Sequence, residues 1–347
     1  MRKLASVEKI VSVRNHPNAD SIELAFIKGW QVVVRKGEFK VGDKVVYISI
    51  DSWVPNTVAP FLSKGNEPRE YEGVKGERLR TVKLRGELSQ GLVLPITMLK
   101  APFNMMEDGG DVSELLGVIK WEPPISTNLA GNTKGGFPHF IQKTDLERIQ
   151  NVYSDMASLG KIKWVMEEKA DGASCTIYTL YHRDGTYDTG VCSRNLEIKM
   201  GDDNNAFVSV AKRDGYVANL HKIGKSLAIQ GELCGPGIQG NKYKLEQLTL
   251  FVFDVYLIDD CSYATRVERW EVLSQLISLG VKVSQVPHLG STTLPTSSQE
   301  CLALAEGKSK INPKQEREGI VFKSSAPING KVVSFKSISN RFLLKEE

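Results

Sequence analysis

The spacing of apolar and polar residues divides the chain into a first part of short strands and a second part that mixes strands with helices. Up to about residue 100, runs rich in Val, Ile and Leu are separated by Gly and Pro, which interrupt regular structure. This pattern predicts no long helix in the first part and five strands, at residues 21–27, 31–36, 44–50, 77–83 and 91–96.

Five short strands without a long helix favour a small closed β-barrel, with an OB-like barrel as the leading candidate. Residues 16–20 and 36–43 also resemble OB domains that bind nucleic acid. A generic β-barrel without a ligand is the alternative. A basic run near its end does not decide between the two, because a solvated face has the same composition; it comprises Arg78, Arg80, Lys83 and Arg85.

The second part follows a connector rich in polar residues and Gly at 101–135, and we place the domain boundary near residue 120. The expected domains are therefore residues 1–120 and 121–347. Strands and helices intermingle beyond the boundary without regular βαβ alternation, which predicts an α+β domain with a mainly antiparallel sheet. The helices are expected at 145–159 and 266–279, and the strands at 164–168, 176–181, 227–232, 248–258, 319–323 and 332–336.

Composition narrows the class of protein without identifying it. The chain has 347 residues, of which 41% are apolar and 25% charged, so two domains with cores of their own can form. The net charge of +4 permits a polyanionic partner but does not require one. The longest apolar run, 248–258, is too short to cross a bilayer. Charges among the first nine residues argue against a signal peptide.

The five cysteines form no Cys-x-x-Cys pair, and their number is odd. A zinc site or a disulfide framework is therefore not expected, and a reducing compartment fits better. We expect an intracellular protein of the cytoplasm, with the nucleus as an alternative. The cysteines are Cys175, Cys192, Cys234, Cys261 and Cys301.

Lys169 is the first candidate for chemistry, because it ends a predicted strand two residues before Asp171 and Gly172. A lysine amine attacks only when it is neutral, so its pKa must fall below the ordinary ~10.4. Burial, neighbouring cations or a bound metal can lower it. Attack on a nucleotide α-phosphate would form a phosphoramidate and expel pyrophosphate. Gly172 would let the chain turn tightly beside the nucleotide. Alone, such a short motif also occurs by chance.

Two carboxylates and two lysines lie at the ends of other apolar strands. Glu232 and Glu318 each adjoin a glycine, and a carboxylate can hold the water shell of Mg²⁺. Lys323 and Lys336 are plausible partners for an α-phosphate. Solvated strand ends carry the same residue types, so none of these positions is decisive by itself.

Phe253 and Arg194 complete the candidates. Phe253 could stack on a purine ring, although an aromatic side chain in an apolar strand usually belongs to the core. Arg194 could reach ribose or phosphate, or belong to a polar turn. No Gly-x-x-x-x-Gly-Lys-Ser/Thr sequence is present, which excludes a P-loop, and no Gly-x-Ser-x-Gly elbow is present either.

In combination, these segments resemble the covalent nucleotidyltransferase superfamily of polynucleotide ligases and capping enzymes. The order of the segments carries the resemblance. It runs from Lys169-Ala170-Asp171-Gly172, similar to the nucleophile motif, through Ser193-Arg194-Asn195, Gly231-Glu232-Leu233 and Phe253-Asp254, to Glu318-Gly319-Ile320-Val321-Phe322-Lys323 and Ser334-Phe335-Lys336.

Within the superfamily the chain is most similar to RNA ligases, particularly the fifth family, which has an OB domain before its catalytic domain. The segment 137–151 also resembles the lead-in to the nucleophile, which implies that Arg148 lies near the triphosphate or RNA. The resemblance implies ATP and Mg²⁺ or Mn²⁺, a lysyl-AMP intermediate, and joining of RNA 3′-hydroxyl and 5′-phosphate ends, as in RNA repair. A monomer acting on RNA, with a nicked duplex among the possible substrates, and no membrane partner are expected.

The resemblance also implies roles for individual residues. The implied catalytic residues are Lys169, Glu232, Glu318, Lys323 and Lys336. The implied metal-linked residues are Glu318 and Asp171. The implied nucleotide-binding residues are Arg148, Glu168, Asp171, Gly172, Arg194, Glu232, Phe253, Lys323 and Lys336.

Two departures from the pattern leave more than one function open. Many relatives have lysine where this chain has Ser334, and Lys331 is a candidate replacement. DNA ligases usually have arginine shortly after the nucleophile motif, where this chain has Ala173 and Ser174, which weakens the DNA-ligase interpretation. A capping guanylyltransferase and a non-catalytic nucleic-acid-binding protein also stay open.

Overall fold

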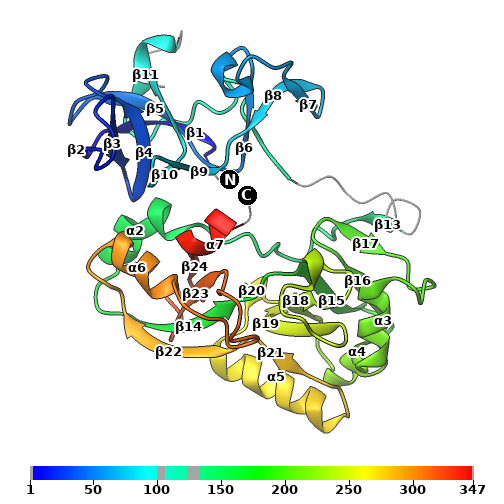
Figure 1. Ribbon diagram of the computed structural model, residues 1–347. Helices are drawn as coiled ribbons and strands as arrows, with labels where there is room; N and C mark the ends of the chain where they lie inside the picture. The colour runs from blue at the N-terminus through cyan, green and yellow to red at the C-terminus, as the bar shows by residue number, and fades with distance from the viewer. Residues whose placement is uncertain (1–2, 100–105, 123–132, 346–347) are drawn as a thin grey trace. The chain divides into compact units, whose positions relative to one another are not determined.

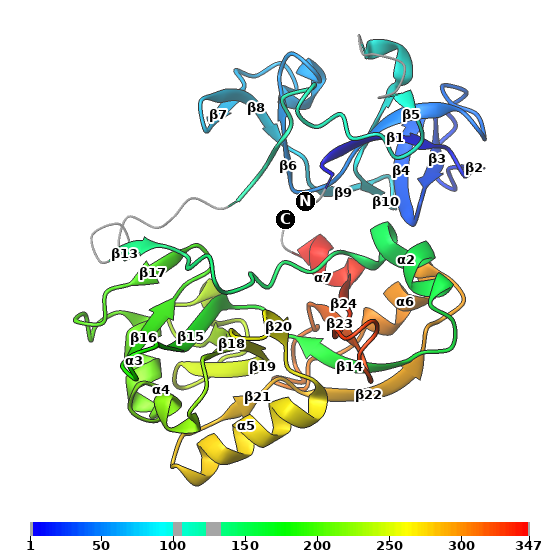
Figure 2. The ribbon, with the colours of Figure 1, turned by 180° about the vertical axis from the view of Figure 1, so that it is seen from behind.

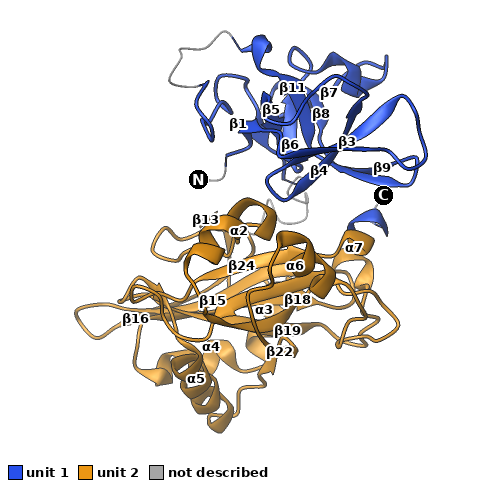
Figure 3. Ribbon diagram, turned by 90° about the vertical axis from the view of Figure 1, so that its left-hand side faces the viewer, with its two compact units in different colours: residues 1–124, 343–347 blue, residues 125–342 orange. Residues whose placement is uncertain are grey.

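The computed structural model describes residues 3–99, 106–122 and 133–345, and the chain divides into two compact units. The first comprises residues 1–124 and 343–347, and the second residues 125–342 (Figure 3). Figures 1 and 2 show the elements from opposite sides. No described helix has the length and apolar character needed to cross a membrane.

Where it is described, the first unit consists of short antiparallel strands in four small sheets, of order β1-β5-β11, β2-β3-β4, β10-β9 and β12-β6-β8-β7. Its strands are β1 (Ala5–Lys9), β2 (Ser12–Asn15), β3 (Ile22–Ile27), β4 (Trp30–Arg35), β5 (Lys44–Ile48), β6 (Ser52–Pro55), β7 (Arg69–Tyr71), β8 (Val74–Arg78), β9 (Thr81–Leu84), β10 (Glu87–Gln90), β11 (Leu92–Pro95) and β12 (Ile119–Lys120). Two short 3₁₀ turns, η1 (Pro60–Ser63) and η2 (Ile96–Met98), join them.

The predicted strands of the first unit are present, but one of them is divided. Residues 77–83 are shared between β8 and β9, because the Leu79 N–H donates to the Ser52 carbonyl and the chain changes sheet there. Apolar side chains alternate inward along β4, where Trp30 is fully buried. The period of two therefore places the core side of these strands correctly.

The described residues of the second unit form two sheets. The larger has the order β13-β17-β16-β15-β18-β19-β20, with β21 on β19, and the smaller the order β22-β14-β23-β24. Its strands are β13 (Thr133–Gly136), β14 (Lys163–Lys169), β15 (Ala173–Tyr181), β16 (Tyr187–Cys192), β17 (Leu196–Ile198), β18 (Leu227–Cys234), β19 (Thr249–Leu257), β20 (Ser262–Tyr263), β21 (Ser284–Gln285), β22 (His288–Thr293), β23 (Gly319–Ser324) and β24 (Ser334–Ile338). Every named pair except β19–β21 is antiparallel, as predicted.

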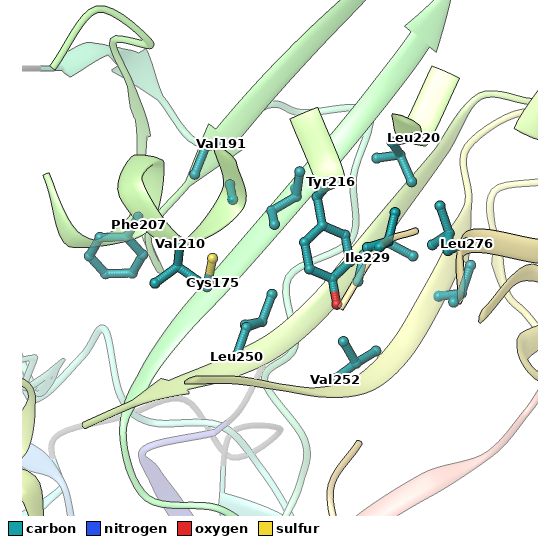
Figure 4. Packing of buried hydrophobic residues seen from close by; sticks show 14 of the residues in the cluster. Cys175, Val191, Phe207, Val210, Tyr216, Leu220, Ile229, Leu250, Val252 and Leu276 are labelled. Carbon is teal, nitrogen blue, oxygen red and sulfur yellow. The ribbon is translucent and has the colours of Figure 1, made fainter. Parts of the chain in front are cut away.

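Helices bury the apolar faces of both sheets. On the larger sheet, side chains of β15, β16 and β18 pack against three helices, α3 (Ala206–Arg213), α4 (Tyr216–Asn219) and α5 (Arg266–Ser278). Figure 4 shows Phe207, Tyr216 and Leu276 of these helices among Ile229 and Val252 of the sheet. On the smaller sheet, Trp164, Phe322 and Phe335 pack with α2 (Ile149–Ser158) and α6 (Ser298–Ala305). Other helical elements among the described residues are η4 (Leu220–Ile223), η5 (Gln239–Asn241) and α7 (Asn340–Lys345).

The helix predicted at 145–159 begins later than expected, at Ile149. The Lys336 N–H donates to the Glu147 carbonyl over 2.9 Å, and Arg148 forms a bridge with Lys336. This pairing with β24 keeps residues 147 and 148 extended, so tertiary contact overrides helical spacing there. The helix predicted at 266–279 is α5, whose first turn is closed by a capping box between Thr265 and Glu268.

Candidate active site

The two sheets of the second unit meet where the chain passes from β14 to β15. Lys169 is the last residue of β14, and residues 170–172 lead into the larger sheet. Lys169 lies opposite Gly319 in the β14–β23 register, so Glu318 lies at the end of the neighbouring strand. The Lys169 Nζ atom is 2.8 Å from the Glu318 Oε2 atom. Two predicted residues that are far apart in sequence therefore meet.

Glu232 reaches the same point from β18. It pairs with Ser174 in the β15–β18 register, and its Oε1 atom accepts the Gly172 N–H over 3.2 Å. A Cβ atom on Gly172 would lie 2.3 Å from the Leu233 carbonyl oxygen and 2.7 Å from the Cys234 Sγ atom. The glycine is therefore required by the close approach of two strands. Gly172 has no positive φ, so a left-handed backbone conformation is not the reason.

Asp171 is held by the loop after β18. Its backbone N–H donates to the Tyr243 hydroxyl over 2.8 Å, and its carboxylate forms an ion pair with Lys242. The Lys242 ammonium lies over the Phe342 ring, 4.8 Å from its centroid. Asp171 is thus fixed beside Lys169 by residues that the sequence did not indicate.

The charges around Lys169 work against the neutral amine that the sequence argument requires. Burial tends to lower the pKa of Lys169, but Glu318, Glu232 and Asp171 outweigh burial and raise it above its ordinary value. Burial, and to a smaller extent Glu318, raise the pKa of Glu232 to about 7 against the opposing effect of Lys169. Burial also raises the pKa of Glu318. Lys169 therefore gains a nucleophilic form only when this negative charge is offset.

A buried ion cluster lies next to the candidate nucleophile and comprises Glu167, Asp254, Arg269 and Lys323. The Lys323 Nζ atom is 2.6 Å from Asp254 Oδ1, 3.0 Å from Glu167 Oε2 and 2.5 Å from the Phe253 carbonyl oxygen. Arg269 binds both oxygens of Glu167. Burial alone would raise the pKa of Glu167, but Lys323 and Arg269 hold it at about 2. Glu167 is therefore a permanent carboxylate.

A pocket opens beside this cluster, with about 610 Å³ of space that is partly open to solvent. Apolar groups and charged groups share its wall, as a nucleotide with a base and phosphates requires. The lining residues are Thr144, Leu146, Glu167, Glu168, Lys169, Ala170, Glu232, Phe253, Asp254, Tyr263, Val286, Val321, Lys323 and Lys336.

Lys336 lines the pocket and contacts the segment that precedes α2. Its Nζ atom lies 3.9 Å from Asp145 Oδ1, and its backbone bridges to Arg148. Burial, together with the positive charges of Arg148 and Lys169, lowers the pKa of Lys336 to about 7. A lysine in this state gains most from an anionic ligand, because a phosphate would stabilise its charged form.

Most of the predicted site residues therefore lie together in the structure. Glu168 and Arg194 are two whose side chains contact other groups than the prediction implied. The Glu168 carboxylate accepts hydrogen bonds from the Ser309 hydroxyl and the Lys310 N–H. It therefore points toward the loop that contains these two residues. Arg194 is largely exposed, with its guanidinium 3.8 Å from Asp145. Of the two residues discussed for the last motif, Ser334 pairs with Lys323 in the sheet, whereas Lys331 is exposed and forms an isolated β-bridge with Ile328.

The carboxylates around Lys169 fit a divalent cation that is held through its water shell. Asp171 and Glu318 both help to raise the pKa of Glu232, and Asp171 helps to raise that of Glu318, so added positive charge would relieve this crowding of negative charge. Among the described residues, no group of three His, Cys, Asp or Glu side chains is placed to hold a metal directly. Mg²⁺ usually keeps several waters, so contact through water is consistent with both observations.

Sequence reasoning missed Glu167 and Arg269 as parts of this site. Glu167 precedes Lys169 by two positions on β14, so the period of a strand was a signal for it. Arg269 continues the buried face of α5, which comprises Val272, Leu273 and Leu276, at the spacing i, i+3, i+4 and i+7. A cation on the apolar face of a helix was therefore visible, but its partners were not.

Comparison with known proteins gives consistent results for both parts of the chain. A model of an OB-fold domain matches residues 4–96, and a model of RNA ligase matches residues 162–338. These matches confirm the predicted α+β class and the order of an OB-like part followed by a ligase part. No curated protein matches the chain.

Several solved structures of Naegleria gruberi RNA ligase are similar over the full length. The structure with pyrophosphate has a TM-score of 0.87 and 41% identity, covering 99% of this chain and 98% of the other. A mutant with AMP and Mn has a TM-score of 0.88 and 41% identity, covering 100% and 99%. A mutant with ATP and Mn has a TM-score of 0.87 and 40% identity, covering 99% of each chain.

Proposed function

This chain belongs to the RNA ligase family and is an ATP-dependent RNA ligase, and we propose that Lys169 is the residue that takes up AMP. The observation that carries the proposal is the meeting of the Lys169 amine, Glu318 and Glu232 beside a pocket lined by both apolar and charged groups. A lysine alone at a strand end would be ordinary. A buried lysine that faces carboxylates from two other strands is typical of a reacting group.

In the first step the Lys169 nitrogen forms a bond to the α-phosphorus of ATP, and the bond to pyrophosphate breaks. The amine must first lose a proton, and Glu318 lies within hydrogen-bonding distance to accept it. A divalent cation, held through its waters by Glu318 and Asp171, would supply positive charge that lowers the pKa of Lys169 and stabilises the phosphates.

We assign the remaining residues of the pocket to binding and orientation. Phe253 and the apolar lining residues hold the adenine, and Glu232 binds the ribose beside Gly172. Lys336 and Lys323 face the α-phosphate, where they stabilise the charge that develops during transfer.

Two predicted arginines and one carboxylate take parts at the margin of the pocket. Arg148 and Arg194, on the segments that meet at Asp145, contact outer phosphates or RNA. Glu168 lines the pocket, but its carboxylate is hydrogen-bonded to Ser309 and Lys310. Glu168 therefore contacts the nucleotide through its backbone or its methylene groups and not through the carboxylate.

The later steps transfer AMP from Lys169 to an RNA 5′-phosphate, and a neighbouring 3′-hydroxyl then displaces AMP to form the phosphodiester. We propose that the OB-like part, predicted at residues 1–120, binds the RNA strand, and that broken RNA, including nicked duplexes, is the substrate. We also propose a monomer that works inside the cell, in the cytoplasm. All five cysteines are free, which agrees with a reducing compartment.

Pre-adenylated RNA separates the role of Lys169 from the rest of the pathway. Lys169→Ala should not seal 5′-phosphate RNA with ATP, but should seal RNA that already carries a 5′-adenylate, because only the first step needs the amine. Failure of the wild-type protein on both substrates would favour a non-catalytic RNA-binding protein. Labelling by GTP instead of ATP would favour a capping enzyme, and equal sealing of all-DNA nicks would favour a DNA ligase.

A further inference from the structure

Arg269 is a member of the buried ion cluster that no motif of the sequence indicated. It lies in the second turn of α5, and its side chain is 13% exposed. Its Nη1 atom is 3.2 Å from Glu167 Oε2 and also donates to the Phe253 carbonyl, while its Nη2 atom binds Glu167 Oε1. The planar fork of an arginine thus fixes a carboxylate and a main-chain carbonyl together.

Lys323 shares both of these acceptors. Its ammonium contacts the same Phe253 carbonyl and the same Glu167 Oε2 atom, and Asp254 is its third partner. Because three acceptors surround an ammonium with three hydrogens, Lys323 can turn to a phosphate only by releasing one of them. Arg269 already satisfies Glu167 and the carbonyl, so such a release leaves no buried acceptor without a donor.

We propose that Arg269 is a positioning residue of the ATP site, which holds Glu167 and the Phe253 carbonyl so that Lys323 is available to the α-phosphate. The inference rests on the proposed role of the pocket. Without Arg269, Lys323 would be the remaining cation for Glu167 and would be drawn away from the nucleotide. The Phe253 backbone, which carries the aromatic ring of the pocket, would also lose one of its two donors.

The attachment of α5 makes Arg269 suited to this role. The capping box of Thr265 and Glu268 fixes the start of the helix one turn before Arg269. Val272, Leu273 and Leu276 then hold the helix on the sheet. The guanidinium is therefore delivered from a rigid element, as accurate positioning requires.

The test measures single-turnover transfer of labelled AMP to the protein as a function of ATP concentration. Arg269→Met should lower the rate at saturating ATP by about tenfold, and Arg269→Lys, which keeps the charge without the fork, should lie between it and the wild type. Arg266→Met is the matched control, since Arg266 is an exposed arginine of the same helix. Its rate should equal that of the wild type.

A double-mutant cycle separates positioning from a general loss of structure. If Arg269 acts through Lys323, adding Arg269→Met to Lys323→Met should change the remaining rate by less than about twofold. An equal tenfold loss in both backgrounds would overturn the inference, as would a normal rate in Arg269→Met. Should Arg269→Met not fold, Arg269→Lys in the same cycle decides the question. Absence of label on the wild type would instead refute the proposed function itself.

Discussion

Replacing Gly172 with alanine tests whether the packing of two strands places the reacting groups. The added Cβ would lie 2.3 Å from the Leu233 carbonyl oxygen, whereas an ordinary contact is 3.4–4 Å, so β15 and β18 must separate. A separation of roughly 1 Å is needed, and overpacking of this kind costs about 1–3 kcal/mol. For a unit of this size, that cost lowers the Tm by roughly 2–12 °C.

The same movement affects chemistry, because the Gly172 N–H is bonded to Glu232 and Lys169 lies three residues earlier. A displacement of ~1 Å can reduce a reaction rate by about 10²-fold. We therefore expect Gly172→Ala to remain folded below its lowered Tm but to take up labelled AMP about 10²-fold more slowly in a single turnover.

Gly201→Ala is the control for this experiment. A Cβ atom there meets no heavy atom within 4 Å, and Gly201 has no positive φ. Its labelling rate and Tm should match the wild type. Wild-type labelling by Gly172→Ala would refute the view that close approach of β15 and β18 sets the geometry of the site.

The charges of the site lead to three further predictions. The folded-state pKa of Glu232 is raised from 4.5 to about 7, so the stability that Glu232 contributes is fully present below pH 4.5 and is lost as the pH rises through about 7. The wild-type Tm should therefore fall more over this pH range than the Tm of Glu232→Gln. Since the pKa of Lys169 is raised and only the neutral amine attacks, single-turnover labelling at fixed Mn²⁺ should increase continuously from about pH 6 to about pH 9; a flat profile would contradict this. Because Lys242 pairs with Asp171, Lys242→Met should reduce the Mn²⁺ concentration for half-maximal labelling by roughly threefold, whereas Lys244→Met, an exposed lysine of the same loop, should leave it unchanged.

The chemistry-bearing residues could be found from the sequence because they lie at strand ends in a characteristic order. Lys169, Glu232 and Glu318 each adjoin an apolar run, and antiparallel pairing then brings those ends together. The structure adds that the carboxylates raise the pKa of Lys169, where the sequence argument sought factors that lower it. That sign depends on distances between strands, which no local pattern contains.

The parts that escaped prediction depend on contacts across the fold. Glu167 and Arg269 come from β14 and α5, and the ion pairs that join them to Asp254 and Lys323 cannot be predicted from the sequence of any one element. Helix α3 was missed although Asn205 caps it, and α6 although Ser297 caps it; each is only 8 residues long, so its apolar pattern extends over about two turns. The late start of α2 at Ile149 reflects pairing with β24, which propensity cannot foresee.

The central claim is that the amine of Lys169 carries AMP before any RNA strand is joined. Peptide mass spectrometry of the protein after incubation with ATP and Mn²⁺ tests it most directly. We expect a single AMP adduct on the peptide that contains Lys169, lost on addition of pyrophosphate and never formed in Lys169→Ala. An adduct on another residue, or unmodified protein that still seals RNA with ATP, would contradict the account.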